Sequence, residues 1–341
     1  MIGVGVVGYG YWGPNLARNI AAASGGRLVA VCDLLASRRE CAGALYPGVA
    51  LTGDYREVIA NPAVDAVAIA TPVSMHYELT MAALRAGKHV LVEKPLTTSS
   101  EQARRLRDEA LRRRLVLLVD FTFLYAGAAR KMRELIADES LGELCYYDAV
   151  RVNPGYYQSD MNVVWDLAVH DVSLMDFALP EKPVAVSATA ACHSSDNIKS
   201  VAYLTFLFPG ALLAHIHVNW FSPLKMRRTL IGCRNKLLAY DDLDACAKLK
   251  IFDMPALPRE GSNGKSNGLG GEHCGNAIYA PALDTVEALQ REVRHFFDCI
   301  EGRALPLTDA EMGVRIVTIL EAVDASIEKN GAYVALESYS R

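Results

Sequence analysis

The first third of the chain alternates short apolar runs with segments of helical periodicity. The apolar runs are residues 2–7, 28–32, 66–70, 90–92 and 115–119, and the helical segments are 15–23, 37–45, 77–86 and 101–113. Strands that are apolar throughout and alternate with helices are typical of a parallel sheet buried between two layers of helices. We therefore predict an α/β domain with a doubly wound parallel sheet over residues 1–120.

From about residue 120 the pattern changes to strands in which apolar and polar residues alternate. A helical segment at 128–136 precedes runs at 144–152, 184–192, 201–208, 212–220, 228–232 and 236–240, and helical segments at 286–300 and 310–328 follow. In the fourth run Ile216 and Val218 point to one face, whereas His215 and His217 point to the other, beside Tyr203 of the neighbouring run. The alternation predicts an open, mostly antiparallel sheet with one buried face. We expect this second α/β domain, residues 121–341, to bind substrate and to contact another subunit through the second face.

Composition and charge exclude several classes of protein. The 341 residues are too many for one core of ordinary size, and a net charge of −4 leaves no basic surface for nucleic acid or an anionic membrane. The eight cysteines are scattered without a C-x-x-C pair, which argues against a disulfide framework and fits reduced thiols. His215 and His217 have no accompanying carboxylate or thiol cluster, so we expect no metal. Without a leader pattern or an apolar run near ~20 residues, we expect a soluble, cytoplasmic protein.

A glycine-rich motif joins the first predicted strand to the first predicted helix. Gly8, Gly10 and Gly13 form G-x-G-x-x-G, with Tyr11 and Trp12 before the last glycine. Such glycines allow a tight turn and bring backbone N–H groups close to a pyrophosphate at the positive end of the helix. Glycines also end strands for purely conformational reasons, which is the alternative explanation. The position between strand and helix favours a dinucleotide.

The end of the second predicted strand bears on the choice between NAD and NADP. Asp33 lies 20 residues after Gly13 (33 − 13), where an acid accepts a hydrogen bond from a ribose 2′-hydroxyl. A carboxylate there repels the 2′-phosphate of NADP and so favours NAD. Arg38 and Arg39 are close enough to soften that preference, although an arginine pair at a helix start is more often merely solvated.

Two further strand ends carry candidate chemistry, because ligands of doubly wound sheets bind at the carboxyl ends of the strands. Thr71 and His76 follow one strand and are candidates for cofactor contact; a capping turn with a surface histidine is the alternative for His76. Glu93, Lys94 and Pro95 follow the next strand, and the bond between Lys94 and Pro95 is a candidate for the cis form. The two-residue period aims the Glu93 and Lys94 side chains in opposite directions. Lys94 is placed to meet a hydroxyl group beside a nicotinamide, unless it is merely an exposed lysine.

The second domain supplies a possible counterpart in VVWDLAVHDVSLMDFAL. Asp166 and His170 are four residues apart, so on a helix they share one face, where the carboxylate can orient the imidazole and stabilise its charged form. Capping or surface polarity is the commoner explanation of such a pair when spacing alone is considered.

Together these motifs resemble the glucose-fructose oxidoreductase, inositol dehydrogenase and rhizopine catabolism (Gfo/Idh/MocA) family of NAD(P)-dependent sugar and cyclitol dehydrogenases. Glu93-Lys94-Pro95 in GKHVLVEKPL is the family's most specific signature. LGELCYYDAVRVN and REVRHFFDCIEGRALPLTDAEMGVRIVTILEAVDAS also follow the family's pattern, so the resemblance covers nearly the whole chain. Within the family, GYGYWGPNLARN is most similar to members that act on nucleotide-linked amino sugars, such as UDP-N-acetylglucosamine-type 3-dehydrogenases, and to related enzymes of antibiotic sugar pathways.

The resemblance implies a Rossmann domain followed by an α/β domain whose open sheet mediates homodimers or homotetramers. It assigns Lys94, Asp166 and His170 to the reacting hydroxyl as catalytic residues. The expected cofactor contacts are Gly8, Gly10, Tyr11, Trp12, Gly13, Asp33, Arg38, Thr71, His76, Glu93 and Lys94. The candidates for substrate contact are Lys94, Arg151, Asn153, Tyr156, Tyr157, His170 and Tyr279.

Two residues depart from the family's pattern. Asp120, in LVDFTFLY, stands where relatives commonly carry histidine, which puts the local polar network in doubt. Ala168, in WDLAVHD, stands where many relatives have glycine, and this change would affect the approach of the substrate rather than the chemistry.

These observations predict reversible hydride transfer between nicotinamide and a secondary hydroxyl of a sugar, an amino sugar (nucleotide-linked or in an aminoglycoside) or a cyclitol. His170, oriented by Asp166, would take the hydroxyl proton while Lys94 donates a hydrogen bond to the oxygen, and the two could exchange roles. The prediction requires Lys94 and His170 to converge on one carbinol carbon. The alternative is a non-catalytic NAD-binding sugar sensor or regulator of the same fold, which the presence of both residues disfavours.

Overall fold

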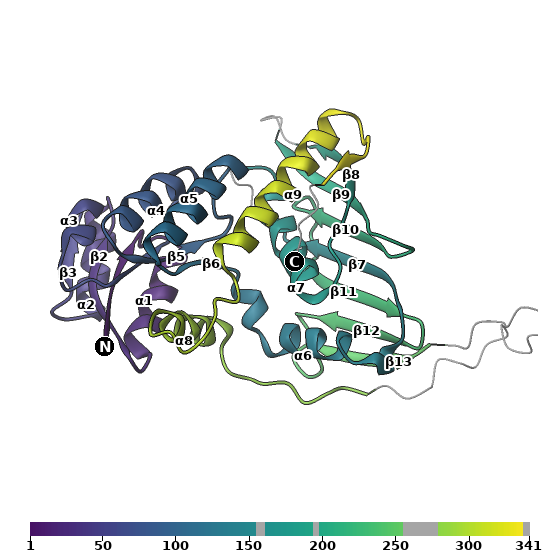
Figure 1. Cartoon of the computed structure of the whole chain (residues 1–341), viewed down its shortest axis with the longest axis horizontal. Coiled ribbons are helices and arrows are strands. Elements are labelled where there is room, and N and C mark those ends of the chain that lie inside the picture. Colours follow the sequence, from purple (N-terminus) through teal and green to yellow (C-terminus); the bar gives the residue numbers. More distant parts are fainter. Residues whose placement is uncertain (155–160, 194–197, 255–278, 337–341) are drawn as a thin grey trace, which may run out of the picture. The chain divides into compact units, whose positions relative to one another are not determined.

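The computed structural model of the chain describes residues 1–154, 161–193, 198–254 and 279–336. The chain forms two compact units (Figure 1). The first consists of Met1–Ala126 and Val286–Glu321, and the second of Gly127–Thr285 and Ala322–Arg341. The assignment of cofactor binding to residues 1–120 and of substrate binding to 121–341 stays a prediction.

The first unit is built on a six-stranded sheet in which every pair of neighbouring strands is parallel. The strands are β1 (Ile2–Val7), β2 (Gly26–Cys32), β3 (Ala50–Thr52), β4 (Ala66–Ile69), β5 (His89–Glu93) and β6 (Leu117–Asp120), in the order β3-β2-β1-β4-β5-β6. The helices are α1 (Gly13–Ala22), α2 (Ala36–Leu45), α3 (Tyr55–Ala60), α4 (His76–Arg85), α5 (Ser100–Arg113), α8 (Ala288–Ile300) and the first part of α9 (Ala310–Glu328), with short 3-10 turns η1 (Val73–Met75) and η2 (Thr122–Tyr125). The predicted doubly wound parallel sheet is confirmed.

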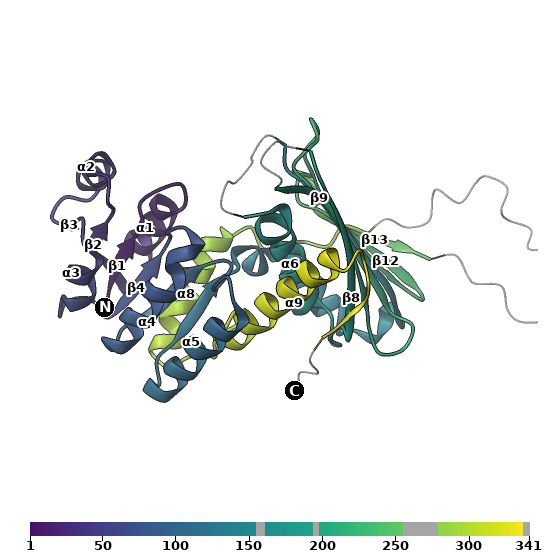
Figure 2. The same ribbon diagram turned by 90° about the horizontal axis from the view of Figure 1, so that it is seen from above.

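The core of the first unit lies around β1, all of whose residues are buried. Leu16 and Ile20 of α1 pack there with Phe296 and Phe297 of α8, and each such side chain contributes about 1.5–3 kcal/mol when it is fully buried. The ring of Phe297 lies so close to the backbone of Gly26 that a Cβ atom there would come within 2.3 Å of it. Figures 1 and 2 both show α8 beside α1.

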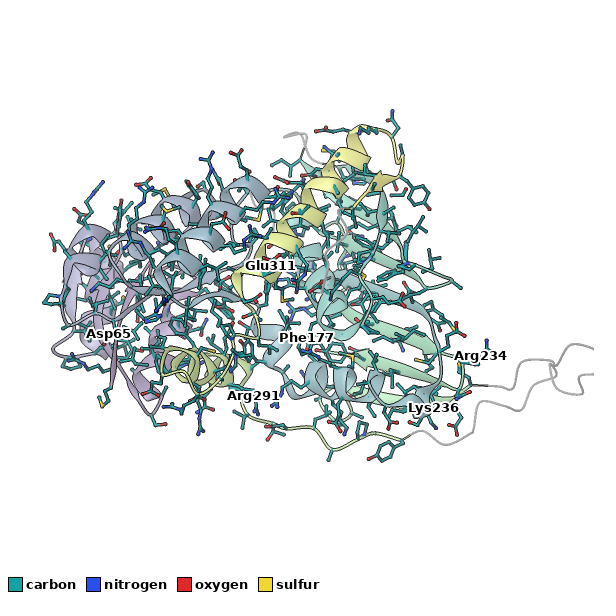
Figure 3. All side chains as sticks on the ribbon, in the orientation of Figure 1. Asp65, Phe177, Arg234, Lys236, Arg291 and Glu311 are labelled. Atoms are coloured by element: carbon teal, nitrogen blue, oxygen red, sulfur yellow. The ribbon has the colours of Figure 1, made fainter. Side chains whose placement is uncertain are left out.

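Two polar contacts fix the ends of elements in this unit. The carboxylate of Asp65, just before β4, accepts a hydrogen bond of 2.7 Å from the backbone N–H of Gly3 in β1. Arg107 of α5 forms a 3.0 Å ion pair with Glu311 of α9. Asp65 and Glu311 are labelled in Figure 3. These contacts join segments that are distant in the sequence but belong to one unit.

The second unit is built on an eight-stranded sheet. Its strands are β7 (Leu144–Val152), β8 (Ala185–Cys192), β9 (Lys199–Leu207), β10 (Leu213–Asn219), β11 (Met226–Cys233), β12 (Lys236–Asp241), β13 (Leu249–Asp253) and β14 (Val334–Ala335), in the order β13-β12-β11-β7-β10-β9-β8-β14. Among the strands that the structure describes in this unit, β7 and β10 are the one pair that is parallel, so the predicted mostly antiparallel sheet is confirmed. Its helices are α6 (Gly127–Ile136), α7 (Val169–Ala178) and the end of α9, with a 3-10 turn η3 (Glu139–Leu141) and a π-helical turn η4 (Val164–Ala168).

The two faces of this sheet differ as predicted. Ile216 and Val218 are fully buried, and Figure 2 shows α6 and the C-terminal end of α9 on one side of the sheet. On the other face Tyr203 is 47% exposed and its ring stacks on His217 with centroids 4.5 Å apart. His215 of the same face lies 3.3 Å from the carboxylate of Asp148. This face therefore combines aromatic rings with charged residues, because Asp148, Arg228, Asp241 and Lys250 lie in the same cross-strand rows as His215 and His217.

Two properties of the described residues bear on the expected environment of the protein. No helix among them is long and apolar enough to cross a membrane. The cysteines at 32, 41, 145, 192, 233, 246 and 299 are free thiols, and Cys274 lies outside the described residues.

Candidate active site

The loop between β1 and α1 is shaped by its glycines. Gly8 has φ +92°, a left-handed conformation that residues with a side chain rarely adopt. A Cβ atom at Gly13 would lie 2.1 Å from the carbonyl oxygen of Gly8, so the loop closes on itself only with glycine there. Helix α1 begins with no side-chain cap and no acidic residue in its first turn, with Pro14 near its start. Its positive end therefore suits an anion such as a pyrophosphate.

Asp33 lies directly after β2 and is 7% exposed. Its Oδ2 accepts a 2.7 Å hydrogen bond from the backbone N–H of Tyr9, and its Oδ1 accepts one of 2.9 Å from the N–H of Leu35. Burial acts to raise the pKa of this carboxyl, but the two N–H groups and the guanidinium of Arg38, 3.3 Å away, outweigh it and hold the pKa below its usual value. Asp33 is thus a charged acceptor that also fixes the glycine loop.

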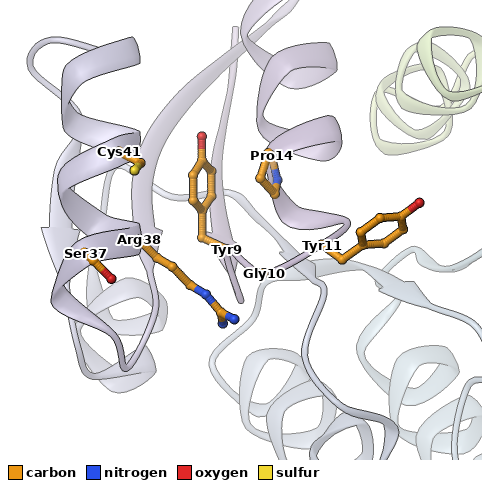
Figure 4. Close-up of a pocket in the computed structure, with 7 residues that line it drawn as sticks. All are labelled: Tyr9, Gly10, Tyr11, Pro14, Ser37, Arg38 and Cys41. Carbon is orange, nitrogen blue, oxygen red and sulfur yellow. The ribbon is translucent and has the colours of Figure 1, made fainter. Parts of the chain in front are cut away.

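A hollow of about 360 Å³ lies beside the glycine loop (Figure 4). Its lining residues are Tyr9, Gly10, Tyr11, Pro14, Ser37, Arg38 and Cys41. Tyr11 is 85% exposed, and the side chain of Arg38 extends toward Gly10 (Figure 4). The hollow, the closed glycine loop and the uncapped start of α1 fit a dinucleotide, with an arginine near the acidic end of β2.

The ends of β4 and β5 are joined through His76. This side chain is 1% exposed; its Nδ1 lies 2.9 Å from the carbonyl oxygen of Pro95 and its Nε2 lies 3.0 Å from that of Thr71. Burial lowers the pKa of His76, and the neutral imidazole donates to only one of the two carbonyls. The alternative of a surface histidine is wrong, whereas direct contact with a cofactor stays a prediction. The hydroxyl of Thr71 is buried and has no hydrogen-bond partner among the described residues, which is consistent with a hydrogen bond to a bound ligand.

Glu93 and Lys94 lie at the same edge of the sheet. The peptide bond between Lys94 and Pro95 is cis, as the sequence indicated. The carboxylate of Glu93 accepts a 3.1 Å hydrogen bond from the backbone N–H of Lys94. Burial and then the carboxylate of Asp120 raise the pKa of Glu93 well above its usual value, and Lys94 acts in the opposite direction. Lys94 is half-buried, so the alternative of a fully exposed lysine is wrong.

Asp120 has a role that the sequence analysis missed. It is 2% exposed at the end of β6, and its Oδ2 accepts a 2.7 Å hydrogen bond from the indole N–H of Trp12 in the glycine loop. Its Oδ1 accepts from the backbone N–H (3.2 Å) and the hydroxyl of Thr122. The departure from the family's pattern at position 120 was the one signal in the sequence for this role. Asp120 forms its own polar network with Trp12 and Thr122.

In the second unit Asp166 lies in the π-helical turn η4 and His170 in the first turn of α7. The carboxylate of Asp166 accepts a 3.0 Å hydrogen bond from the indole N–H of Trp220, just after β10. The turn itself is held by Asp324 of α9, whose carboxylate accepts from Trp165 Nε1 at 2.6 Å and from the Asn162 side chain at 3.1 Å. The helical location predicted for the pair is confirmed, and its catalytic role stays a prediction.

The other candidates for substrate contact are dispersed. Arg151 of β7 is buried, and its guanidinium is paired with Asp171. The residue thus has a structural partner already, and its contact with substrate stays a prediction. Asn153 follows β7 and its N–H donates to the carbonyl of Asn219 at 3.0 Å. Tyr279 is 61% exposed and pairs with β13 on the side away from β12, so it lies four strand spacings, about 19 Å, from β7. Tyr156 and Tyr157 lie outside the described residues.

Comparison with known families and proteins agrees with this architecture. The family model described as "Oxidoreductase family, NAD-binding Rossmann fold" matches residues 2–121, and the model described as "GFO/IDH/MocA C-terminal domain" matches residues 129–237. UDP-N-acetylglucosamine 3-dehydrogenase of Acidithiobacillus ferrooxidans is 34% identical over 334 residues, which covers 95% of this chain and 96% of that protein. The NADP-dependent scyllo-inositol 2-dehydrogenase of Bacillus subtilis is 26% identical over 96% of this chain and 94% of its own. The match to 1,5-anhydro-D-fructose reductase of Ensifer adhaerens, 34% identical, covers 51% of this chain and only about half (54%) of the reductase.

Solved structures share the whole fold. The structure of the Acidithiobacillus ferrooxidans 3-dehydrogenase has a TM-score of 0.81 at 25% identity and covers 96% of this chain and 98% of its own. An oxidoreductase domain protein of Kribbella flavida has a TM-score of 0.85 at 20% identity, with 99% of both chains covered, and shows similarity of fold alone.

Proposed function

Because the chain belongs to the Gfo/Idh/MocA family of oxidoreductases with an NAD-binding Rossmann domain, we propose that it is an NAD(P)-dependent dehydrogenase of a secondary hydroxyl on a sugar or cyclitol. The observation that supports this most is the shared edge of the first sheet. There the glycine loop, the hydroxyl of Thr71, which has no partner among the described residues, and the Glu93-Lys94 pair lie at the ends of β1, β4 and β5. A dinucleotide along this edge would bring its reactive end near Lys94.

For the substrate we favour an amino sugar linked to a nucleotide. The relative that matches nearly end to end at 34% identity is named as a UDP-N-acetylglucosamine 3-dehydrogenase. The motif GYGYWGPNLARN resembles the same kind of enzyme. Free sugars, cyclitols and aminoglycosides, including substrates of antibiotic pathways, are the other classes to be tested, since inositol dehydrogenases are also among the relatives.

The proposed chemistry assigns one role to each polar side chain. When bound, the nicotinamide accepts or returns the pair of electrons and the hydrogen at the carbinol carbon. His170, oriented by Asp166, takes the hydroxyl proton, and Lys94 donates a hydrogen bond that stabilises the oxygen as negative charge develops. The two roles are exchangeable between Lys94 and His170. Trp220, which donates to Asp166, restrains the carboxylate that orients His170.

We also propose that the protein assembles through the open face of its second sheet as a homodimer or homotetramer in the cytoplasm. The unlike faces of the sheet support this, because Tyr203 (47% exposed) and Leu213 (44% exposed) present apolar surface on a face without helices among the described residues. The free thiols of the described residues suit a reducing compartment. Light scattering of wild type and Tyr203→Glu measures the assembly, and a monomeric wild type would contradict it.

Binding and turnover are tested in sequence. NADH and NADPH fluorescence titrations come first, followed by a screen of NAD(P) reduction against nucleotide sugars, free sugars, inositols and aminoglycosides. We expect NADH binding and turnover with at least one class. Binding without turnover across the screen would support the sugar sensor instead, and absence of dinucleotide binding would contradict both.

A further inference from the structure

Three acidic side chains meet in the interior of the first unit, and we call Glu93, Asp120 and Glu292 the carboxyl cluster. Glu93 and Asp120 are direct partners in the pairing of β5 with β6, and Glu292 approaches from α8. Glu292 is fully buried and Asp120 is 2% exposed. Burial, followed by the carboxylate of Asp120, raises the pKa of both Glu93 and Glu292 well above the usual value of a glutamate. Both causes favour the protonated form of a carboxyl in this cluster.

The hydrogen-bond donors are distributed unequally over the carboxyl cluster. Asp120 accepts from Trp12 and Thr122, and Glu93 accepts from the backbone N–H of Lys94. Both oxygens of Glu292 are buried without an N–H or O–H partner at hydrogen-bond geometry within the described ranges, although the nearby hydroxyl of Thr122 acts to lower the pKa of Glu292. Its strongest side-chain interaction is with the carboxyl of Asp120. Two carboxyl groups attract each other only when a proton lies between them, and a buried carboxylate without a donor is strongly unfavourable.

A proton explains the cluster better than a metal ion. The described residues hold no group of three histidine, cysteine, aspartate or glutamate side chains arranged to bind one. Trp12 Nε1 donates to one oxygen of Asp120 and the hydroxyl of Thr122 donates to the other, which suits a carboxylate that accepts several hydrogen bonds. Glu292 is then the acid that donates a hydrogen bond to Asp120.

We propose that Glu292 is a positioning residue of the glycine loop, which as a neutral carboxylic acid donates a hydrogen bond to Asp120 and so keeps Asp120 aligned on the indole N–H of Trp12. Trp12 is the last residue before α1 and precedes Gly13, so a shift of its ring moves the loop that we assign to the dinucleotide. The effect on cofactor binding rests on the proposed function, whereas the contact between Glu292, Asp120 and Trp12 does not.

Loss of the proton should release the loop. The groups that act on the Glu292 carboxyl are Asp120 of β6, Glu93 of β5 and Thr122 of η2, and Glu292 acts in turn on Tyr125 of η2. Lys94 acts on Glu93. Of the helices packed together here, α1 carries Arg18, which is paired with Glu287 at the surface, and α8 itself carries His295. Burial and Glu292 raise the pKa of Tyr125 well above its usual value, so Tyr125 stays neutral. As pH rises, Glu292 and Asp120 become like charges, and their repulsion disturbs the contact with Trp12.

The direct test is NMR of the full chain labelled with [15N]indole tryptophan, which has three indole signals for its three tryptophans. Trp12→Phe identifies the signal of Trp12. We expect that signal to shift with pH in the wild type, to lose the shift in Glu292→Gln, whose amide donates without titrating, and to move at every pH in Glu292→Ala. A Trp12 signal that is identical in wild type and Glu292→Ala would overturn the proposal, and circular dichroism confirms that each variant is folded.

A double-mutant cycle measures the consequence for the cofactor. We expect Glu292→Ala to weaken NADH binding roughly tenfold, as for loss of a hydrogen bond to a charged group, and Glu292→Gln to restore it to within about threefold. In a Trp12→Phe background Glu292→Ala should add little, because the two act through one contact. Fully additive effects would overturn the route through Trp12. Gln290→Ala, an exposed neighbour on α8, is the matched control. If wild type fails to bind NADH, the proposed function fails while the indole signals still decide this inference.

Discussion

Arg151 and Asp171 form a two-pronged ion pair in the interior of the second unit. Nε and Nη2 of Arg151 donate to the two carboxylate oxygens of Asp171 at 2.7 and 3.1 Å, and their side chains are 6% and 3% exposed. Asp171 follows His170 in α7, so the pair fixes the helix that carries a proposed catalytic residue against β7.

Arg151→Met should lower the free energy of unfolding by about 3–5 kcal/mol, because it leaves the Asp171 carboxylate buried without its partner. Urea unfolding followed by circular dichroism measures the change. Arg234→Met is the matched control, since Arg234 pairs with Glu143 on the surface with 61% and 65% of their side chains exposed, and its loss should cost less than about 1 kcal/mol. Equal effects of the two substitutions would contradict a structural role of the buried pair.

Lys94→Ala and His170→Ala should each reduce turnover at least a hundredfold while NADH affinity changes little, because each removes a group that acts on the reacting hydroxyl. Steady-state rates with the substrate found by screening, together with NADH titration, separate the two effects. Lys225→Ala, an exposed lysine of the second unit, serves as the control and should be neutral. Near-normal rates in both variants would remove Lys94 and His170 from the mechanism.

Arg38 should decide how well NADP is accepted. Its guanidinium lies 3.3 Å from Asp33 and is 47% exposed, so it is available to a 2′-phosphate that Asp33 alone would repel. We expect Arg38→Ala to weaken NADPH binding about tenfold and NADH binding less than about threefold. Arg39→Ala is the control, because Arg39 donates to the backbone carbonyls of Asp33 and Leu34 instead. An equal loss for both nucleotides would contradict this assignment.

His76 should make the first unit sensitive to acid. Burial lowers its pKa below the value of 6.5 that it has in the unfolded chain. The unfolded chain therefore takes up a proton that the folded chain resists, and stability is lost as pH falls through 6.5 and below. Each unit of difference in pKa corresponds to about 1.4 kcal/mol. Thermal unfolding of wild type and His76→Gln is measured from about pH 8 to about pH 5, the range in which histidine titrates. We expect the melting temperature to fall less with decreasing pH in the variant than in the wild type. Parallel curves of melting temperature against pH would contradict the prediction.

A strand that is buried on both faces has no polar positions and so appears in the sequence as a continuous apolar run. For this reason most strands of the first unit could be predicted from the apolar runs. Val4 and Val6 are fully buried in β1, and the predicted run 2–7 coincides with the strand. Strand β3 and helix α3, of three and six residues, were missed because they are too short to show a period. Alternation likewise revealed the buried and open faces of β10, on which Val218 and His217 lie.

The site was predicted less completely, because motifs identify strand ends but not the contacts between them. The glycine loop, Asp33 and Lys94 could be placed from their spacing alone. The bond from Trp12 to Asp120 joins residues 108 positions apart, and no local pattern indicates it. Glu292 lies among Leu289, Val293 and Phe296 on the buried face of α8, and a charged residue at an apolar position was the available signal.

The return of the chain to the first unit has a consequence for protein synthesis. On a ribosome, β1 to β6 emerge long before α8 and the first part of α9, which complete that unit up to residue 321. The 195 residues from 127 to the end of that unit at 321 (321 − 126) take ~10–40 s at ~5–20 residues per second. Until α8 emerges, Gly26 and the apolar face of α1 lack the ring of Phe297 that covers them in the folded unit, so the nascent N-terminal part exposes apolar surface of the kind that makes folding intermediates prone to aggregate.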